Sequence, residues 1–184
     1  GGQTTPNLTG IGANTYDVTV TDGRNCTATA QVVVTEPTPL VVSITQTAFI
    51  QCNGDLTASI TANASGATPN YNFAWSNSVN TAINAGIGEG TYTVTVTDDN
   101  GCSEIQSIVV TEPDPILPNL NIDATISCNG VCDGAVSVAP SGGVGPYTVD
   151  WQVGMTAAGN SATALCAGVA YDVTITDGNG CQVI

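Results

Sequence analysis

The most informative stretch of this chain is TYTVTVTDDNGC, which runs from Thr91 to Cys102. Tyr92, Val94 and Val96 alternate with threonines, which is typical of a β-strand with one buried face. The Asp-Asp-Asn-Gly that follows favours a tight turn, because these residues tolerate turn conformations, including positive φ. The segment therefore predicts a strand, a hairpin turn and then a cysteine, with no reactive group among them.

The same segment occurs three times, and the other copies are TYDVTVTDGRNC (15–26) and AYDVTITDGNGC (170–181). Further anchors recur in one register: the junction VVVTEPTP returns as IVVTEPDP, Cys52 as Cys128, and Trp75 as Trp151. Self-similarity at a fixed period, here about 76 residues, indicates tandem modules. The last copy is slightly longer between its tryptophan and its tyrosine. We expect residues 1–37 to be the C-terminal half of one repeat, 38–113 a complete repeat, and 114–184 a repeat that lacks the end of its last strand.

One module reads as six or seven short strands separated by turns, and no stretch has the 3.6-residue period of a helix. This pattern predicts an all-β fold of tandem immunoglobulin-like antiparallel β-sandwiches. Trp75 is expected on a central strand, and Tyr92 at the start of the penultimate one. The predicted core aromatic residues are Trp75, Trp151, Tyr16, Tyr92 and Tyr171.

Composition excludes several functions. The chain has a single basic residue, Arg24, no histidine and 15 acidic residues, for a net charge of −14. Binding to nucleic acid or to an anionic membrane surface is not expected, because both need clustered Lys and Arg. No apolar run is long enough to insert into a membrane. Without histidine there is no Ser-His-Asp or Cys-His pair, so we expect no catalytic residue, no cofactor and no enzymatic activity.

The seven cysteines favour disulfides formed in an oxidising compartment, because the chain has no Cys-x-x-Cys pair and no histidine for a zinc site. We expect one bridge inside each module, Cys52–Cys102 and Cys128–Cys181. Cys26 would then pair with a residue outside this sequence. Bridges between neighbouring modules, Cys26–Cys52 and Cys102–Cys128, remain an alternative. A bridge that closes about 50 residues stabilises a module by about 4 kcal/mol in the chain-entropy model.

Cys132 and Cys166 occur in the last module alone. Counted from the neighbouring cysteine and tyrosine, they occupy the places of Leu56 and Ile87 in the middle module. We therefore expect Leu56 and Ile87 to touch in the core, and Cys132 and Cys166 to replace that contact with a second bridge.

The turn carboxylates Asp22, Asp98, Asp99 and Asp177 are weak calcium candidates. Since the spacing of an EF-hand is absent, we expect them to close turns instead, with no metal site. Trp75, Trp151, Tyr71 and Tyr147 could form a sugar-stacking platform, but their places within strands favour core packing.

The segments SCNGVCDGAVSVAPSGGVGPYTVDW (127–151) and LCAGVAYDVTITDGNGC (165–181), together with the VVVTEP junction, resemble the SprB repeat. The middle module departs from it with TPNY (68–71) and with no Asp-Gly after its Cys-Asn-Gly. This family includes the long surface adhesin of gliding bacteria that use type IX secretion. The resemblance implies an extracellular, cell-surface filament whose partners are neighbouring repeats, surface polysaccharide and the gliding machinery. A glycan- or calcium-binding module, or a spacer of a secreted enzyme, remains an alternative.

Overall fold

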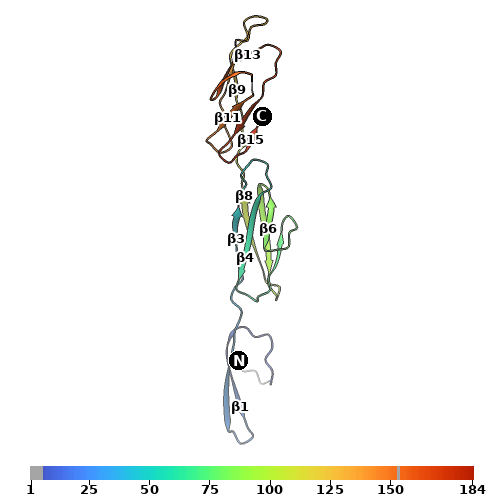
Figure 1. The fold of residues 1–184 in the computed structure, drawn as a ribbon. Helices are drawn as coiled ribbons and strands as arrows, with labels where there is room; N and C mark the ends of the chain where they lie inside the picture. Colours follow the sequence, from blue (N-terminus) through green and yellow to red (C-terminus); the bar gives the residue numbers. More distant parts are fainter. Residues whose placement is uncertain (1–5, 153) are drawn as a thin grey trace.

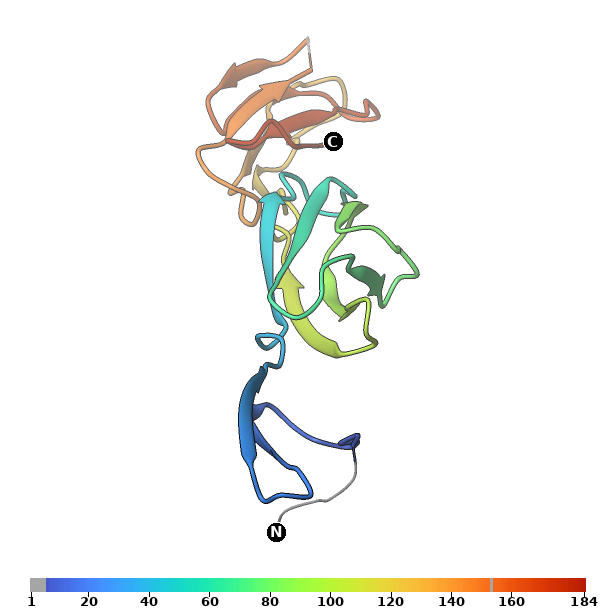
Figure 2. The same ribbon diagram turned by 90° about the horizontal axis from the view of Figure 1, so that it is seen from below.

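The computed structural model describes residues 6–152 and 154–184, and every regular element in these ranges is a β-strand. The strands form five antiparallel sheets in three groups along the chain. The three groups lie end to end, so that the molecule is long and thin (Figures 1 and 2). The chain is therefore all-β, and its middle and C-terminal modules are immunoglobulin-like sandwiches, as the alternating pattern predicts.

The N-terminal group is a hairpin of β1 (Asn14–Thr21) and β2 (Thr27–Val34), with Thr21 opposite Thr27. Four of its five valines are exposed, Val20 to 64%, because no second sheet covers the hairpin among the described residues. Tyr16 is half-buried, and its hydroxyl donates to the carbonyl of Gly12 at 2.9 Å. This segment thus forms a hairpin without a core of its own.

The middle module consists of two facing sheets. Both have three strands, and their orders are β3-β4-β6 and β5-β7-β8. The strands are β3 (Val41–Ala48), β4 (Ala58–Ser65), β5 (Asn72–Trp75), β6 (Ile83–Ile87), β7 (Gly90–Thr97) and β8 (Ser103–Val110). This is the strand arrangement of an immunoglobulin sandwich in which the first, second and fifth strands oppose the third, sixth and seventh.

The core of the middle module lies between these sheets. Ile60, Val94 and Val96 are fully buried, and Trp75 is only 4% exposed. The Trp75 indole N–H donates to the carbonyl of Thr81 at 2.9 Å, so burial leaves no polar atom unpaired on this side chain. The Tyr92 hydroxyl donates to the carbonyl of Gly88 at 3.1 Å, which is the tyrosine corner of immunoglobulin-like folds.

The C-terminal module repeats the plan with one addition. Its sheets have the orders β12-β13-β10-β9 and β11-β14-β15. The strands are β9 (Leu120–Ala124), β10 (Gly134–Val138), β11 (Thr148–Trp151), β12 (Thr156–Ala158), β13 (Ser161–Leu165), β14 (Val173–Thr176) and β15 (Gln182–Val183). β12 has no counterpart in the middle module and forms a hairpin with β13 at the sheet edge. Trp151 and Tyr171 are half-buried in this module.

The extra length of the C-terminal module is divided between two places. Ala58 pairs with Ile87 in the middle module, and Gly134 pairs with Leu165 in the C-terminal one. Leu165, not Cys166, is therefore the structural counterpart of Ile87, and the alignment by tyrosine was wrong by one position here. Part of the insertion precedes β13, and the rest follows Leu165.

Candidate junction between modules

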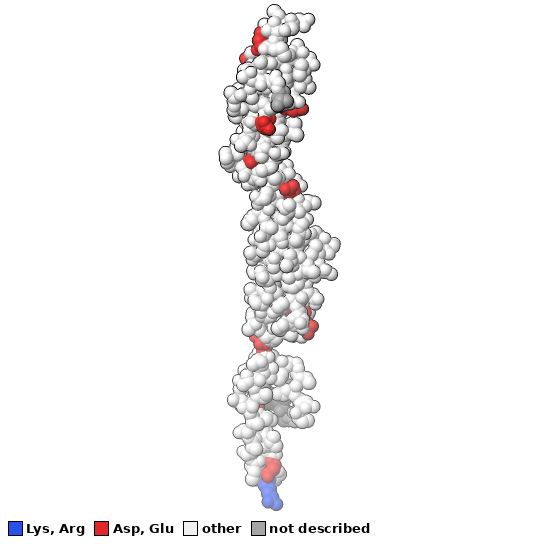
Figure 3. All heavy atoms as spheres, in the orientation of Figure 1, with Lys and Arg blue, Asp and Glu red and all other residues white. Residues whose placement is uncertain are grey.

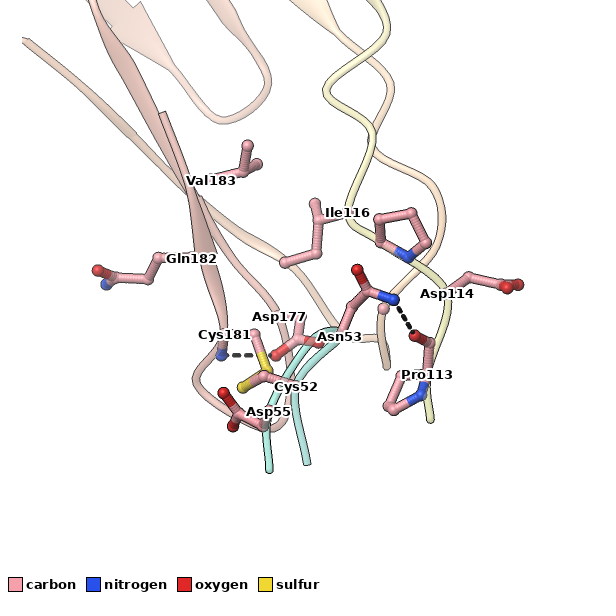
Figure 4. Close-up of a pocket in the computed structure, with 12 residues that line it drawn as sticks. Cys52, Asn53, Asp55, Pro113, Asp114, Ile116, Asp177, Cys181, Gln182 and Val183 are labelled. Carbon is pink, nitrogen blue, oxygen red and sulfur yellow. Dashed lines mark hydrogen bonds between the residues drawn. A yellow bond between two sulfur atoms is a disulfide. The ribbon is translucent and has the colours of Figure 1, made fainter. Parts of the chain in front are cut away.

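The most elaborate site in the described part of the chain is the junction between the middle and C-terminal modules. Three segments meet there: the loop after β3 (51–55), the linker (111–116) and the turn between β14 and β15 (177–181) (Figure 4). They enclose a recess of about 360 Å³ that residues of both modules line. Because the loop belongs to the middle module and the turn belongs to the C-terminal module, their contacts fix one module relative to the other.

A disulfide crosses this junction. It joins Cys52 to Cys181, at a sequence separation of 129, with the Cα atoms 5.5 Å apart. Beside it, the side-chain amide of Asn179 donates to the carbonyl of Gln51 at 2.9 Å. A covalent bond and a hydrogen bond thus connect the turn of one module to the loop of the previous one.

The expected pairings Cys52–Cys102 and Cys128–Cys181 are wrong. Cys52 lies at the end of the middle module that faces Cys181. Cys102 immediately precedes β8, and β8 runs toward this junction, so Cys102 lies near the opposite end of the module. The two ends of β8 are about 23 Å apart at the rise of an extended strand, whereas a disulfide needs Cα atoms within about 7 Å. The alternative pairings Cys26–Cys52 and Cys102–Cys128 do not occur either. Among the described residues the unpaired cysteines, all exposed, are Cys26, Cys102 and Cys128.

The linker is attached to the middle module through its own residue Glu112. The Glu112 carboxylate accepts hydrogen bonds from the side-chain amide of Asn53 at 2.7 Å and from the backbone amide of Gly54 at 2.8 Å. The Asn53 amide also donates to the carbonyl of Pro113 at 3.1 Å. The Cys-Asn-Gly loop therefore provides a bonding cysteine and two donors for the Glu-Pro linker, which explains why these short motifs occur together.

The linker also contacts the C-terminal module. The amide of Gly143 donates to the carbonyl of Asp114 at 2.7 Å. The carbonyl of Pro115 lies against Gly142, where a Cβ atom would overlap it and where φ is +74°. Glycine is needed at this position for both reasons.

The same docking occurs one repeat earlier, between the N-terminal hairpin and the middle module. There the amide of Ala67 donates to the carbonyl of Thr38 at 2.8 Å, and the carbonyl of Pro39 lies against Gly66. Both linkers therefore enter the following module with the same geometry.

The aspartate of each hairpin turn organises the cysteine that follows. Asp177 Oδ1 accepts from the amides of Asn179 and Cys181, each at 2.9 Å, and Oδ2 accepts from the amide of Val144 at 2.9 Å. The Val144 hydrogen bond is the main reason why the pKa of Asp177 is lowered from its ordinary value, against the opposing effect of desolvation. The Asp177 carboxylate thus connects the turn to the loop on which the linker docks.

Asp98 has the same role in the middle module. Its Oδ1 accepts from the amides of Asn100 at 3.0 Å and Cys102 at 2.7 Å, and its Oδ2 accepts from Thr68 at 3.1 Å. Desolvation raises the pKa of Asp98, but these backbone hydrogen bonds outweigh it, so the net shift is downward.

Three of the four weak calcium candidates, Asp22, Asp98 and Asp177, therefore have the turn role that the sequence favours. Asp22 Oδ1 also accepts from two turn amides, those of Arg24 and Cys26. Asp99 is exposed beside Asp98. Within the described ranges no group of three or more acidic or cysteine side chains could hold a metal ion.

Cys132 and Cys166 are joined in the second disulfide, the pair expected from their joint appearance in the last module. The contact that this bridge replaces is not the expected one. Leu56 is 68% exposed and not part of the core. Its Cδ2 lies close to Gly88, which is the structural counterpart of Cys166. The bridge thus replaces a surface contact of leucine with glycine, and only its leucine partner was identified from the sequence.

Together, these contacts define a class: tandem immunoglobulin-like sandwiches joined end to end by docked linkers and, at one junction, by a disulfide. The family model of the SprB repeat matches residues 49–80 and 125–156. The two matches are in register with the anchors found in the sequence, and each contains a Cys-Asn-Gly loop and the following tryptophan. Two segments of the chain, one in the middle module and one in the C-terminal module, therefore carry the SprB repeat.

The family match indicates an adhesin-like structural segment from secreted surface proteins, and the two disulfides fit an extracellular protein. A comparison with curated proteins gave no match for this chain. No helix long and apolar enough to cross a membrane occurs in the described residues.

Proposed function

We propose that this chain is part of the stalk of a long secreted surface filament, of the SprB type that gliding bacteria use as an adhesin. Its role there is mechanical: it holds a distant binding end away from the cell and transmits load. The observation that carries the proposal is the Cys52–Cys181 bridge, which locks consecutive modules together. Neighbouring repeats are the direct partners, and surface polysaccharide and the gliding machinery are the partners of the whole filament.

The surface of the molecule supports a passive role. Acidic side chains are scattered along the visible face, and Arg24 lies at the far end of the N-terminal hairpin (Figure 3). A net charge of −14 makes neighbouring filaments repel one another, which opposes lateral pairing of exposed strand edges. Trp75, a candidate for sugar stacking, is buried and presents no face to a ligand.

The bridge defines how load passes through the chain. A force applied to the two ends reaches Cys52 and then Cys181 through the disulfide, so the residues between them in sequence carry no load. In the reduced chain these residues extend when the modules unfold. At about 3.3–3.6 Å per residue, they add about 420–460 Å of contour length.

Single-molecule stretching of the full chain tests this function. We expect the oxidised chain to lack this extension and the reduced chain to show it. The Cys132→Ser/Cys166→Ser variant is a matched control, because it removes the nested bridge and should keep the extension hidden until reductant is added. Equal contour lengths with and without reductant would contradict the mechanical role of the junction.

A further inference from the structure

Each unpaired cysteine occupies the same position in its module as a cysteine that is bonded in another module. Cys128 lies in a Cys-Asn-Gly loop one repeat after the loop of Cys52, which is bonded. Cys26 and Cys102 each end a hairpin turn, as the bonded Cys181 does. All three unpaired cysteines are exposed and therefore accessible to a partner outside their own module.

The hairpin turns hold these cysteines in the same way. Asp22, Asp98 and Asp177 each accept the amide hydrogen of the cysteine that ends the turn, at 2.9, 2.7 and 2.9 Å. We call Cys26, Cys102 and Cys181 the closing cysteines. Since one of the three is bonded in this conformation, the other two are already held in the conformation that bonding requires.

The remaining parts of the junction also recur. The Cys-Asn-Gly loop is present at 52–54 and at 128–130, and the Thr-Glu-Pro linker at 35–37 and 111–113. Both linkers dock on the next module through equivalent contacts, at Gly66 and at Gly142. The linker thus docks in the same way on the module that follows it, and the Glu112, Asn53 and Gly54 that fix it to the preceding module belong to the recurring sequence motifs. If these contacts form at every junction, consecutive modules share one orientation, and the same two cysteines meet at each junction.

We propose that Cys52–Cys181 is one rung of a disulfide ladder, in which the Cys-Asn-Gly cysteine of each module bonds to the closing cysteine of the next. Cys26 and Cys102 then bond to the Cys-Asn-Gly cysteine of the module before their own. Cys128 bonds to the closing cysteine of the module after its own. Each rung forms when two thiols lose two protons and two electrons to a disulfide oxidant, which is reduced to a dithiol. The ladder deepens the stalk function proposed above and rests on it.

The ladder has a mechanical consequence that a single bridge lacks. The observed rung has a sequence separation of 129, which is more than one repeat, so successive rungs of this kind overlap. Load can pass from a closing cysteine to the next Cys-Asn-Gly cysteine, as from Cys102 to Cys128, through the short stretch 103–127 alone. That stretch contains β8, the linker and β9, most of which is already extended. A laddered filament therefore lengthens little even if the interior of a module unfolds.

The number of free thiols in a longer chain tests the ladder. A second copy of residues 38–113, inserted after Pro113 of the full chain, reproduces both linker sequences and raises the number of cysteines from seven to nine. The ladder predicts three free thiols, counted by mass spectrometry after alkylation of the oxidised, denatured chain. Five free thiols would show that the bridge is peculiar to the observed junction, and one would show pairing within modules. Either result overturns the ladder.

Two variants of the longer chain sharpen the count. Cys52→Ser in the first copy should release the closing cysteine of the inserted copy and raise the number of free thiols from three to four. Cys26→Ser should lower it from three to two. The stalk function is tested separately on the same molecule, because its maximum dimension in X-ray scattering should increase with the added module. A chain that lengthens but has five free thiols would refute the ladder and leave the stalk function intact.

Discussion

The middle and C-terminal modules share one strand plan but are stabilised differently. The middle module buries Trp75 to 4% exposure and has a continuous core around it. In the C-terminal module Trp151 is half-buried, and β12 is added at the edge of the sheet. Only the C-terminal module has an internal disulfide, Cys132–Cys166. A covalent bond thus accompanies the weaker core, as small domains with limited burial commonly require.

The first prediction concerns the two tryptophans. Trp75→Ala removes a buried side chain from a packed core and should lower the free energy of unfolding of the middle module by about 3–5 kcal/mol. Trp151→Ala should cost the C-terminal module clearly less, because part of that side chain is already in water. Calorimetry of the full chain measures both effects, and the fluorescence of the remaining tryptophan reports on the unmutated module.

Ile105→Ala is a suitable control for these variants, since Ile105 is 58% exposed on the outer face of β8. It should change stability by less than about 0.5 kcal/mol. Equal losses for Trp75→Ala and Trp151→Ala would mean that the two cores are equivalent and that the internal disulfide compensates for nothing.

The second prediction concerns the internal disulfide, which is removed from the C-terminal module and introduced into the middle module. Cys132→Leu/Cys166→Gly gives the C-terminal module the pair that the middle module has, Leu56 and Gly88. Opening a bridge with a sequence separation of 34 should lower its stability by about 3–4 kcal/mol. The reverse change, Leu56→Cys/Gly88→Cys, should add a bridge to the middle module, because Leu56 Cδ2 already lies close to the position of a Cβ atom at residue 88.

Thermal unfolding and non-reducing mass spectrometry measure both changes. Cys26→Ser, which removes an exposed and unpaired thiol, should leave both modules unaffected. Two results would contradict this prediction. Either Leu56→Cys/Gly88→Cys forms no disulfide, or the C-terminal module keeps its melting temperature without the Cys132–Cys166 disulfide.

Much of the fold could be predicted from the sequence, because strand alternation and turn chemistry are local properties. The alternation after Thr91 and the turn at Asp98 identify the hairpin of β7 and β8, and the repeat period identifies the modules. The aromatic positions also follow from the pattern: Trp75 packs in the core, and Tyr92 lies near the start of β7 and forms the tyrosine corner.

The disulfide between modules could not be predicted from cysteine spacing, because spacing along the chain does not encode how modules stack. The predicted fold did contain a usable signal. In an immunoglobulin-like sandwich the loop after the first strand and the turn before the last strand lie at opposite ends, which excludes Cys52–Cys102. End-to-end stacking then leaves Cys52 beside the closing cysteine of the next module, Cys181.

The third prediction concerns a feature in which the two modules do not differ, the turn aspartates. The pKa values of Asp98 and Asp177 are lowered from the ordinary value of 3.8, because backbone amides donate to the charged carboxylates. Their stabilising contribution is fully present above that value and is lost as the pH falls through the lower pKa of the folded state. Melting temperatures measured from pH 7 to pH 2.5 should therefore fall in both modules at the acidic end.

Asp98→Asn isolates this contribution in the middle module. The amide retains an oxygen for the hydrogen bonds from Asn100 and Cys102, but it directs an NH₂ group at the backbone amide of Thr68, where the carboxylate had an acceptor. The variant should be less stable at pH 7, and the difference should shrink below pH 4 as the native carboxylate is protonated. Asp99→Asn removes the same charge one residue away, where the side chain is exposed, and should keep the native pH profile. If both variants flatten the profile equally, general charge repulsion rather than the turn hydrogen bonds governs the acid sensitivity of the modules.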